Sequence, residues 1–277
     1  MIWPLTARRR LPVDDDAWRT LCTQLPFLHG LDSAQSRRLR ELAAEFLSAK
    51  TITGAQGQRV DDAMRLTIAA QACLPVLHLG LQHYRDFVEI VVYPAEFVVQ
   101  RRVTDDDGLV HEFEDTLAGE AMDGGPVVLS WPDAAGGQGD DRTNVVIHEF
   151  AHKLDLADGL ADGCPPMPAA HRSVWLQTLH AAYDRFVADV EAAEHAIPRH
   201  VDPESPAADR FFEGLALDPY AATDEAEFFA VATEVFFVDP VRLAHAFGRL
   251  YAELATYFGQ DPRARVAGGA SLADRGD

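Results

Sequence analysis

Apolar side chains in the first third of the chain recur at the three- and four-residue spacing of a helix. Asp32 or Ser33 can cap one such helix, and its apolar stripe continues for four turns. Asp61 or Asp62 can cap a second helix, and the connection between the two is rich in Gly and Thr. The pattern predicts a mostly helical N-terminal part over about residues 15–86.

The middle of the chain changes from a helical to an extended pattern. Residues 88–93 are mostly β-branched and are followed by Pro94, which is typical of a strand that ends there. Three further segments have the same character and are predicted as strands: residues 97–103, 109–113 and 127–131. Segment 127–131 is either an ordinary core strand or an edge strand able to pair with an extended peptide, and the sequence leaves both open.

The second half of the chain returns to helical spacing. A helix that begins near Thr143 or Asn144 and ends at about residue 156 is followed by a Gly- and Pro-rich loop. Further helices are predicted at residues 175–193, 225–238 and 240–257. Residues 263–277 are rich in Gly, Ala, Asp and Arg and are predicted to be a disordered tail. We expect a single α+β domain over residues 1–262, with a small mixed sheet packed on the helix that starts at 143 or 144.

Composition restricts the class of protein. The chain has 277 residues, of which 48% are hydrophobic, so it can build a sizeable core. No apolar run reaches the roughly 18 residues that span a membrane, and we expect neither a membrane segment nor a secretion signal. The formal net charge of -20 opposes binding to phosphate backbones, so we expect no direct contact with nucleic acid.

The three cysteines, Cys22, Cys73 and Cys164, are odd in number and far apart. This arrangement argues against a disulfide framework and against a thiolate zinc site, both of which need an appropriate pairing or spacing. The cysteine usage therefore favours a reducing cytoplasm as the location of the protein.

The pentapeptide His148-Glu149-Phe150-Ala151-His152 lies within the helix that is predicted to start at residue 143 or 144. Two histidines four positions apart lie on the same face of a helix, one turn above the other. Their imidazole nitrogens can then reach one tetrahedral metal ion. Glu149, next to the first histidine, is placed to take a proton from a water bound to that ion. The motif predicts metal-dependent hydrolysis.

A catalytic zinc ion usually takes three protein ligands and leaves a fourth position for water. The helix predicted at 225–238, with Thr223 as its expected cap, carries Glu227 and Glu234 two turns apart on one face. Phenylalanines flank this face, and a carboxylate buried among them needs a partner. We expect Glu227 to be the third ligand and Glu234 to orient an imidazole, with Glu234 as the alternative ligand. Asp155 either orients an imidazole as well or is an exposed residue at the end of the motif helix.

These segments resemble the Mlc titration factor A family of bacterial metallopeptidases. The likeness rests on residues 144–155, with the histidine pair, and on residues 220–229, with a tyrosine followed seven residues later by a glutamate. Three further segments resemble the family pattern, namely residues 62–73, 125–131 and 161–166. The resemblance covers roughly residues 15–262. A more distant likeness is to the catalytic domain of anthrax lethal factor, which shares the spacing of the tyrosine and the glutamate.

The resemblance implies a zincin-like, gluzincin-type fold in which one zinc ion per chain is bound by His148, His152 and Glu227. It also implies that Glu149 is the general base and that Tyr220 is a catalytic tyrosine near the metal, where its hydroxyl could stabilise an oxyanion. The family is cytoplasmic and cleaves aminopeptidase-type peptide substrates. It also binds the glucose-responsive transcriptional repressor Mlc and thereby relieves repression of sugar uptake, which makes an Mlc-like repressor an expected partner.

Two hypotheses about function follow. The chain is either a zinc peptidase or a protein that sequesters a repressor while its metal site is regulatory or idle, and the resemblance permits both in one molecule. A structural zinc site is disfavoured, because Glu149 would then have no role and three ligands would leave a position open.

Overall fold

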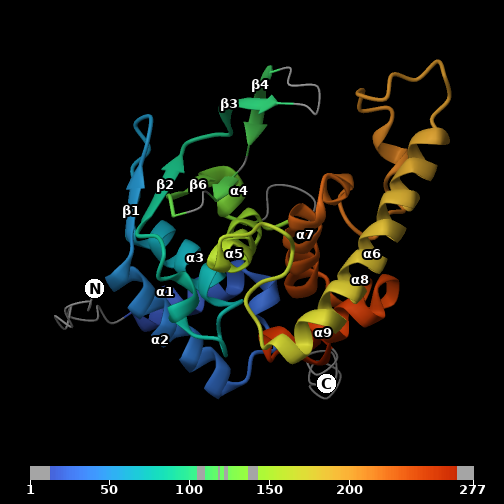
Figure 1. Cartoon of the computed structure of the whole chain (residues 1–277). Coiled ribbons are helices and arrows are strands. Elements are labelled where there is room, and N and C mark those ends of the chain that lie inside the picture. The colour runs from blue at the N-terminus through green and yellow to red at the C-terminus, as the bar shows by residue number, and fades with distance from the viewer. Residues whose placement is uncertain (1–12, 105–109, 118, 122–123, 137–142, 267–277) are drawn as a thin grey trace, which may run out of the picture.

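The computed structural model describes residues 13–104, 110–117, 119–121, 124–136 and 143–266. Figure 1 shows helix α5 (Val145–Asp155) near the centre, with the sheet and the N-terminal helices on one side and the C-terminal helices on the other. This is an α+β, zincin-like fold in which a small mixed sheet packs on the motif helix between helical N- and C-terminal parts. The fold class expected from the sequence is thus confirmed.

The strands of the described chain form two separate sheets. Their bounds are β1 (Thr51–Gly54), β2 (Glu89–Tyr93), β3 (Phe97–Thr104), β4 (Val110–Leu117), β5 (Gly119–Ala121) and β6 (Val127–Ser130). The larger sheet has the order β1-β2-β6-β5, in which β1, β2 and β6 are parallel and β5 is antiparallel to β6. Strands β3 and β4 pair only with each other as an antiparallel hairpin, with Phe97 opposite Leu117.

Strand β6 lies inside the larger sheet, between β2 and β5, and all four of its residues are buried. The possibility that segment 127–131 forms an exposed edge is therefore wrong, and its reading as a core strand is right. The edge is instead β5, a three-residue strand that follows β4 and turns back against β6. Trp131 is not in the strand, because the chain turns into a short helix, α4, at that residue.

The helices begin and end close to the predicted positions. Their bounds are α1 (Asp15–Gln24), α2 (Ser33–Ala49), α3 (Asp62–Cys73), α4 (Trp131–Ala134), α5 (Val145–Asp155), α6 (Ala169–His195), α7 (Glu225–Val238), α8 (Pro240–Ala246) and α9 (Gly248–Phe258). Asp32 caps α2 by accepting hydrogen bonds at 2.8 Å from the backbone of Ala34 and Gln35, and Asp61 caps α3. Of each pair of candidate caps, the first residue is the cap and the second begins the helix.

Two of the predicted helices differ from the structure. Helix α6 begins at Ala169 rather than 175, directly after Pro168, and Arg172 in its added turn pairs with Asp162 at 3.3 Å. The helix predicted at 240–257 is two helices that are separated by Phe247. Phe247 leaves the helical conformation to pack its buried ring 6.0 Å from that of Phe228, an edge contact.

The predicted disordered tail is also partly wrong. Residues 263–266 are helical, and Arg265 of this segment donates to Gln260 Oε1 at 2.7 Å. The rest of the predicted tail lies outside the described residues. The assignment of residues 1–262 to one domain stays a prediction.

Aromatic packing fixes α5 against the N-terminal part of the molecule. The ring of Phe150 is fully buried and lies 5.6 Å from Phe46, 5.1 Å from Tyr84 and 5.8 Å from Phe87. Such tilted and edge-on contacts stabilise more than burial alone, by about 0.5–1.5 kcal/mol per pair. Because Phe150 lies between the two motif histidines in sequence, this cluster holds the opposite face of α5 towards α7.

Helix α7 is buried almost all round, as expected of a helix at the centre of a large core. Its phenylalanines Phe228, Phe229 and Phe236 are fully buried, so the helix cannot rotate without breaking the core. The face that meets α5 carries Glu227 and Glu234. Two rigid helices therefore hold the motif histidines and these carboxylates against each other.

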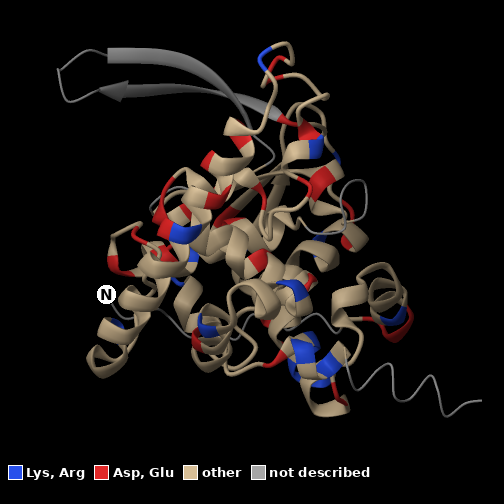
Figure 2. Cartoon of the chain, turned by 90° about the vertical axis from the view of Figure 1, so that its right-hand side faces the viewer, with Lys and Arg blue, Asp and Glu red and all other residues tan. Residues whose placement is uncertain are grey.

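Acidic residues are spread over much of the chain, with fewer basic ones among them (Figure 2). This distribution matches the net charge of -20. Among the described residues, no helix combines the length and the apolar character that crossing a membrane requires.

Candidate metal centre

The cap of helix α5, Asn144, is also hydrogen-bonded to a residue of the site. The side chain of Asn144 caps the helix by accepting from the backbone of Ile147 at 2.9 Å. From this cap the helix runs regularly through His148 and His152, whose rings lie edge to face with centroids 4.7 Å apart. Both imidazoles are therefore presented on one face of α5, as their spacing predicts.

Three donor atoms from α5 and α7 converge on one point. His148 Nε2 lies 3.1 Å from His152 Nε2, and Glu227 Oε2 lies 3.1 Å from the former and 3.2 Å from the latter. These three residues form a cluster whose ligand atoms could together hold a metal ion. The side chains of all three are mostly buried, with 13% of each imidazole and 17% of Glu227 exposed.

The dimensions of this triangle fit a tetrahedral ion. Ligand bonds of about 2.0–2.1 Å in a tetrahedral zinc site place neighbouring ligand atoms about 3.3 Å apart. The observed separations of 3.1–3.2 Å are close to that value on all three edges. Two imidazoles and one carboxylate are also the donor set of many catalytic zinc sites, which leave a fourth position for water.

Two contacts orient Glu227, one at its backbone N–H and one at its carboxylate. Asp224 caps α7 and accepts from the backbone of Glu227 at 2.9 Å, so the expectation that Thr223 is the cap is wrong. Thr223 instead donates its hydroxyl to the carbonyl of Tyr220 at 2.8 Å. While Glu227 Oε2 faces the histidines, its Oε1 accepts from the hydroxyl of Tyr220 at 3.1 Å. Tyr220 is therefore at the site, where sequence reasoning expected it.

Tyr220 approaches the site from the solvent side. It belongs to a short 3-10 helix, Pro219–Ala222, which Asp218 caps by accepting from the backbone of Tyr220 at 2.9 Å. Its ring centroid lies 6.3 Å from that of His148, and 43% of the residue is exposed. An exposed phenol whose hydroxyl reaches the cluster can interact with a molecule bound at the same point.

Glu234 orients His148 and the start of α5 together. One oxygen, Oε1, lies 2.6 Å from His148 Nδ1, and the other, Oε2, accepts from the backbone of Asn144 at 2.5 Å. A hydrogen bond at Nδ1 fixes the ring so that Nε2 is available to a metal. The geometry thus favours Glu234 as the orienting carboxylate rather than as the ligand, the preference reached from the sequence.

The hydrogen bonds continue beyond Glu234 into α3. Asn144 Nδ2 donates to Gln71 Oε1 at 2.7 Å, and the Gln71 amide donates to the carbonyl of Ala134 at 2.8 Å. Gln71 is fully buried. Sequence reasoning missed it, and the available signal was a single amide in the otherwise apolar end of α3. These bonds tie the cap of the motif helix to two other parts of the core.

Glu149 lies beside the cluster and is nearly inaccessible, with 4% of the residue exposed. Burial raises the pKa of its carboxyl from the ordinary 4.5 to about 7, against the opposing effect of the two histidines. Its Oε2 has no hydrogen-bond partner among the described residues. A buried carboxylate that keeps an oxygen unpaired next to a potential metal site is suited to exchange a proton with a bound molecule.

Opposite charges within the cluster stabilise each other and shift the pKa values of its members. Burial by itself would lower the pKa of His148, but hydrogen bonds to Glu227 and Glu234 raise it well above its usual value. Burial would likewise raise the pKa of Glu227, but its bonds to both imidazoles hold it far below the usual range. The site therefore stabilises an ionised Glu227 facing a positive charge, which a divalent cation would also supply.

Asp155 is fully buried, so its interpretation as an exposed helix-end residue is wrong. Its Oδ2 accepts from the backbone of Gly163 at 2.8 Å, which fixes the loop after α5. Its Oδ1 has no hydrogen-bond partner among the described residues. The hydrogen bond between Asp155 and Gly163 thus orients the loop, and within the described part of the chain no hydrogen bond joins Asp155 to an imidazole.

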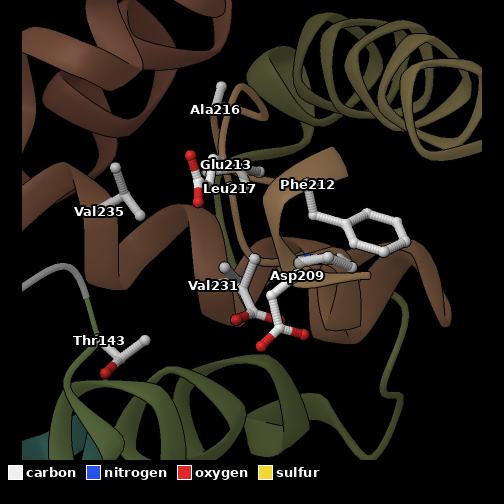
Figure 3. Close-up of a pocket in the computed structure, with 10 residues that line it drawn as sticks. Thr143, Asp209, Phe212, Glu213, Ala216, Leu217, Val231 and Val235 are labelled. Atoms are coloured by element: carbon white, nitrogen blue, oxygen red, sulfur yellow. The ribbon is translucent and has the colours of Figure 1, made fainter. Parts of the chain in front are cut away.

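A cavity of about 280 Å³ lies along α7 (Figure 3). Val231 and Val235 of α7 form one wall of the cavity, and the rest is lined by Thr143 and by residues 209, 212, 213 and 216–219. Val231 is one helical turn beyond Glu227 on the same side of α7. The cavity therefore adjoins the metal-binding candidates, although none of the three lines it.

The fold and the site together define the class as a zincin-like metallopeptidase fold with a His, His, Glu cluster. Residues 3–259 match the family described as glucose-regulated metallo-peptidase M90. The chain belongs to this family.

Proteins named Mlc titration factor A are similar to this chain over nearly its full length. That of Escherichia fergusonii is 36% identical over 265 residues, which is 95% of this chain and 93% of the relative. That of Serratia proteamaculans is 36% identical over 243 residues, or 87% and 86% of the two chains. That of Cronobacter sakazakii is 34% identical over 277 residues, or 99% and 98%. The expected family resemblance is therefore confirmed.

Proposed function

We propose that this protein is a zinc-dependent peptidase of aminopeptidase type, with one zinc ion bound by His148, His152 and Glu227. The observation that carries the proposal is the triangle of donor atoms, 3.1–3.2 Å on each edge, with Glu149 beside it. When bound, zinc supplies a Lewis acid that lowers the pKa of a coordinated water and polarises a carbonyl. The remaining steps belong to side chains of this chain.

Glu149 is the proposed general base. Its carboxylate takes a proton from the attacking water and later returns it to the amine that leaves. The position of its buried carboxyl beside the two histidines supports this role, because a general base has to lie within reach of the water from which it takes a proton. The unpaired Oε2 is the atom that we expect to hold the proton.

Tyr220 is proposed to stabilise the negative charge that develops on the carbonyl oxygen. Its hydroxyl reaches Glu227 Oε1 at 3.1 Å, and rotation about its side-chain bonds can redirect this donor towards a substrate. The exposure of the ring supports such a movement, because no core packing has to be broken.

Hydrolysis of amino-acid 4-nitroanilides, with and without a chelator, tests the proposal. We expect turnover by the purified protein, loss of turnover with the chelator, and recovery when zinc is added back. The Glu149→Gln variant should bind zinc like the parent and lose turnover by about 100-fold or more. Turnover that survives chelation, or full turnover in Glu149→Gln, would contradict the mechanism.

A second function is favoured by the names of the relatives. Titration of Mlc is stated in those names, and the similarity covers nearly the whole chain. We therefore propose binding to an Mlc-like transcriptional repressor as a further property, with a cytoplasmic location, which the free thiols of Cys22, Cys73 and Cys164 support. Calorimetric titration of the repressor with the parent and with Glu149→Gln separates this function from catalysis. Equal binding by both proteins, without turnover by the parent, would leave the sequestering function alone.

A further inference from the structure

The edge strand β5 lies directly against the motif helix at Glu149. Strand β5 is antiparallel to β6, with Gly119 opposite Leu129, and it packs on α5. Gly119 is the first residue of the strand. It lies so close to Glu149 that a residue with a side chain would not fit there at ordinary contact distances.

A Cβ atom added to Gly119 would overlap Glu149 Oε1 and would lie 2.7 Å from Glu149 Cγ and 2.7 Å from Val145 Cγ2. Carbon atoms in contact are normally about 3.5–4.0 Å apart. Glu149 is 4% exposed, so its side chain has little free space into which it could retreat. The bare main chain of β5 thus forms one wall of the space that Glu149 occupies.

The backbone conformation at residue 119 does not itself require a glycine. Its φ lies outside the left-handed range, unlike that of Gly163 or Gly259, where a side chain would be strained by the backbone itself. An alanine at 119 can therefore adopt the local conformation. Its side chain would, however, displace Glu149 and Val145 from their positions.

We infer that Gly119 is a positioning residue for the general base: the absence of a side chain at 119 sets the orientation of the Glu149 carboxylate. This inference rests on the proposed role of Glu149. A side chain at 119 pushes the carboxylate away from the position that it occupies beside the histidines. A displacement of about 1 Å at a reacting group can reduce a rate by about 100-fold.

The Gly119→Ala variant tests the inference by separating rate from metal binding. We expect kcat on a nitroanilide substrate to fall at least tenfold, while the zinc dissociation constant, measured against a chromogenic chelator, changes less than threefold. Gly248→Ala is the matched control, because in the described structure its added Cβ would meet nothing within 4 Å beyond its own helix backbone and chain neighbours, and its backbone is not left-handed. A kcat within twofold of the parent would overturn the inference, and so would a loss of zinc affinity that accounts for the lost rate.

The contact with Val145 requires its own control. Val145→Ala, combined with Gly119→Ala, removes the overlap with Val145 and leaves the overlap with Glu149. We expect kcat to stay low in the double variant. Recovery to within twofold of the parent would assign the effect to Val145 and overturn the inference.

A thermal unfolding cycle keeps the inference testable if the parent shows no peptidase activity. Gly119→Ala should lower the melting temperature in the parent, and this loss should shrink by at least half in the Glu149→Ala background, where the overlap with Glu149 is gone and only the one with Val145 remains. An equal loss in both backgrounds would overturn the inference whatever the activity of the parent. Absence of turnover in the parent would contradict only the proposed function.

Discussion

Replacement of Glu234 by glutamine removes one acceptor from a site that uses two. In the structure the two carboxylate oxygens serve two donors, the backbone N–H of Asn144 at 2.5 Å and the Nδ1 of His148 at 2.6 Å. Glutamine has one oxygen and one NH2 group, so it can accept from only one of them. The other donor then faces an N–H group. The size of Glu234 and its packing are almost unchanged, which confines the perturbation to hydrogen bonding and charge.

The loss can be worked out from these two contacts. If the glutamine oxygen stays with Asn144, His148 loses the partner that orients its ring, and loss of such a partner weakens metal binding by about 10–100-fold. That factor corresponds to about 1.4–2.8 kcal/mol of metal-binding free energy. If the oxygen instead follows His148, the buried N–H of Asn144 is left unpaired, which costs about 1–3 kcal/mol of folding free energy. Either outcome is measurable.

Two measurements on Glu234→Gln distinguish these outcomes. Competition with a chromogenic chelator gives the zinc dissociation constant, and denaturant unfolding of the metal-free protein gives the free energy of unfolding. We expect a loss in at least one of them. Glu225→Gln is the matched control, because it makes the same chemical change in the first turn of the same helix. Surface substitutions usually change stability by no more than about 0.5 kcal/mol, which sets the threshold for a real effect. The proposed role of Glu234 would be refuted if Glu234→Gln matched the parent within twofold in zinc affinity and within about 0.5 kcal/mol in stability.

Three further predictions concern individual side chains. Glu227→Ala should lower the ratio of bound zinc to protein well below that of the parent in elemental analysis, and an unchanged ratio would point to Glu234 or water as the third ligand. Tyr220→Phe should reduce kcat by about 100-fold with zinc content unchanged, and equal kcat in both proteins would remove the tyrosine from the mechanism. Asp155→Asn should unfold at a higher temperature than the parent at pH 8 and at a similar one near pH 4. The reason is that burial raises the pKa of Asp155 to about 7, so that its ionisation above that pH opposes folding. Near pH 4 the folded state is protonated and the unfolded state, with a pKa of ~3.9, is about half protonated, which leaves only a small difference. A lower melting temperature for the variant at pH 8 would contradict this reasoning.

Local sequence is enough to predict which candidate side chains share a helix face. The spacing of His148 and His152 requires only that α5 be a helix, and this helix begins at Val145, within one residue of the predicted start. The positions of Glu227 and Glu234 on one face follow from the regularity of α7. Tyr220 came from the family resemblance and not from any local pattern.

The parts that were missed depend on contacts between distant segments. Gln71 reaches Asn144 across 73 positions of sequence, and no local pattern encodes that contact. Strand β5 has only three residues, Gly119–Ala121, which carry no strand pattern, so β6 could not be recognised as an inner strand. Phe247 interrupts the last helices because of its ring contacts in the core, whereas the sequence around it continues the helical spacing.

The central claim is that one metal ion is held jointly by α5 and α7. Anomalous diffraction at the zinc edge, from crystals grown with zinc, tests it most directly. The account predicts a single strong peak about 2.0–2.2 Å from His148 Nε2, His152 Nε2 and a carboxylate oxygen of Glu227. A peak bound to the histidines with Glu227 turned away into solvent, or no peak between these helices, would contradict it.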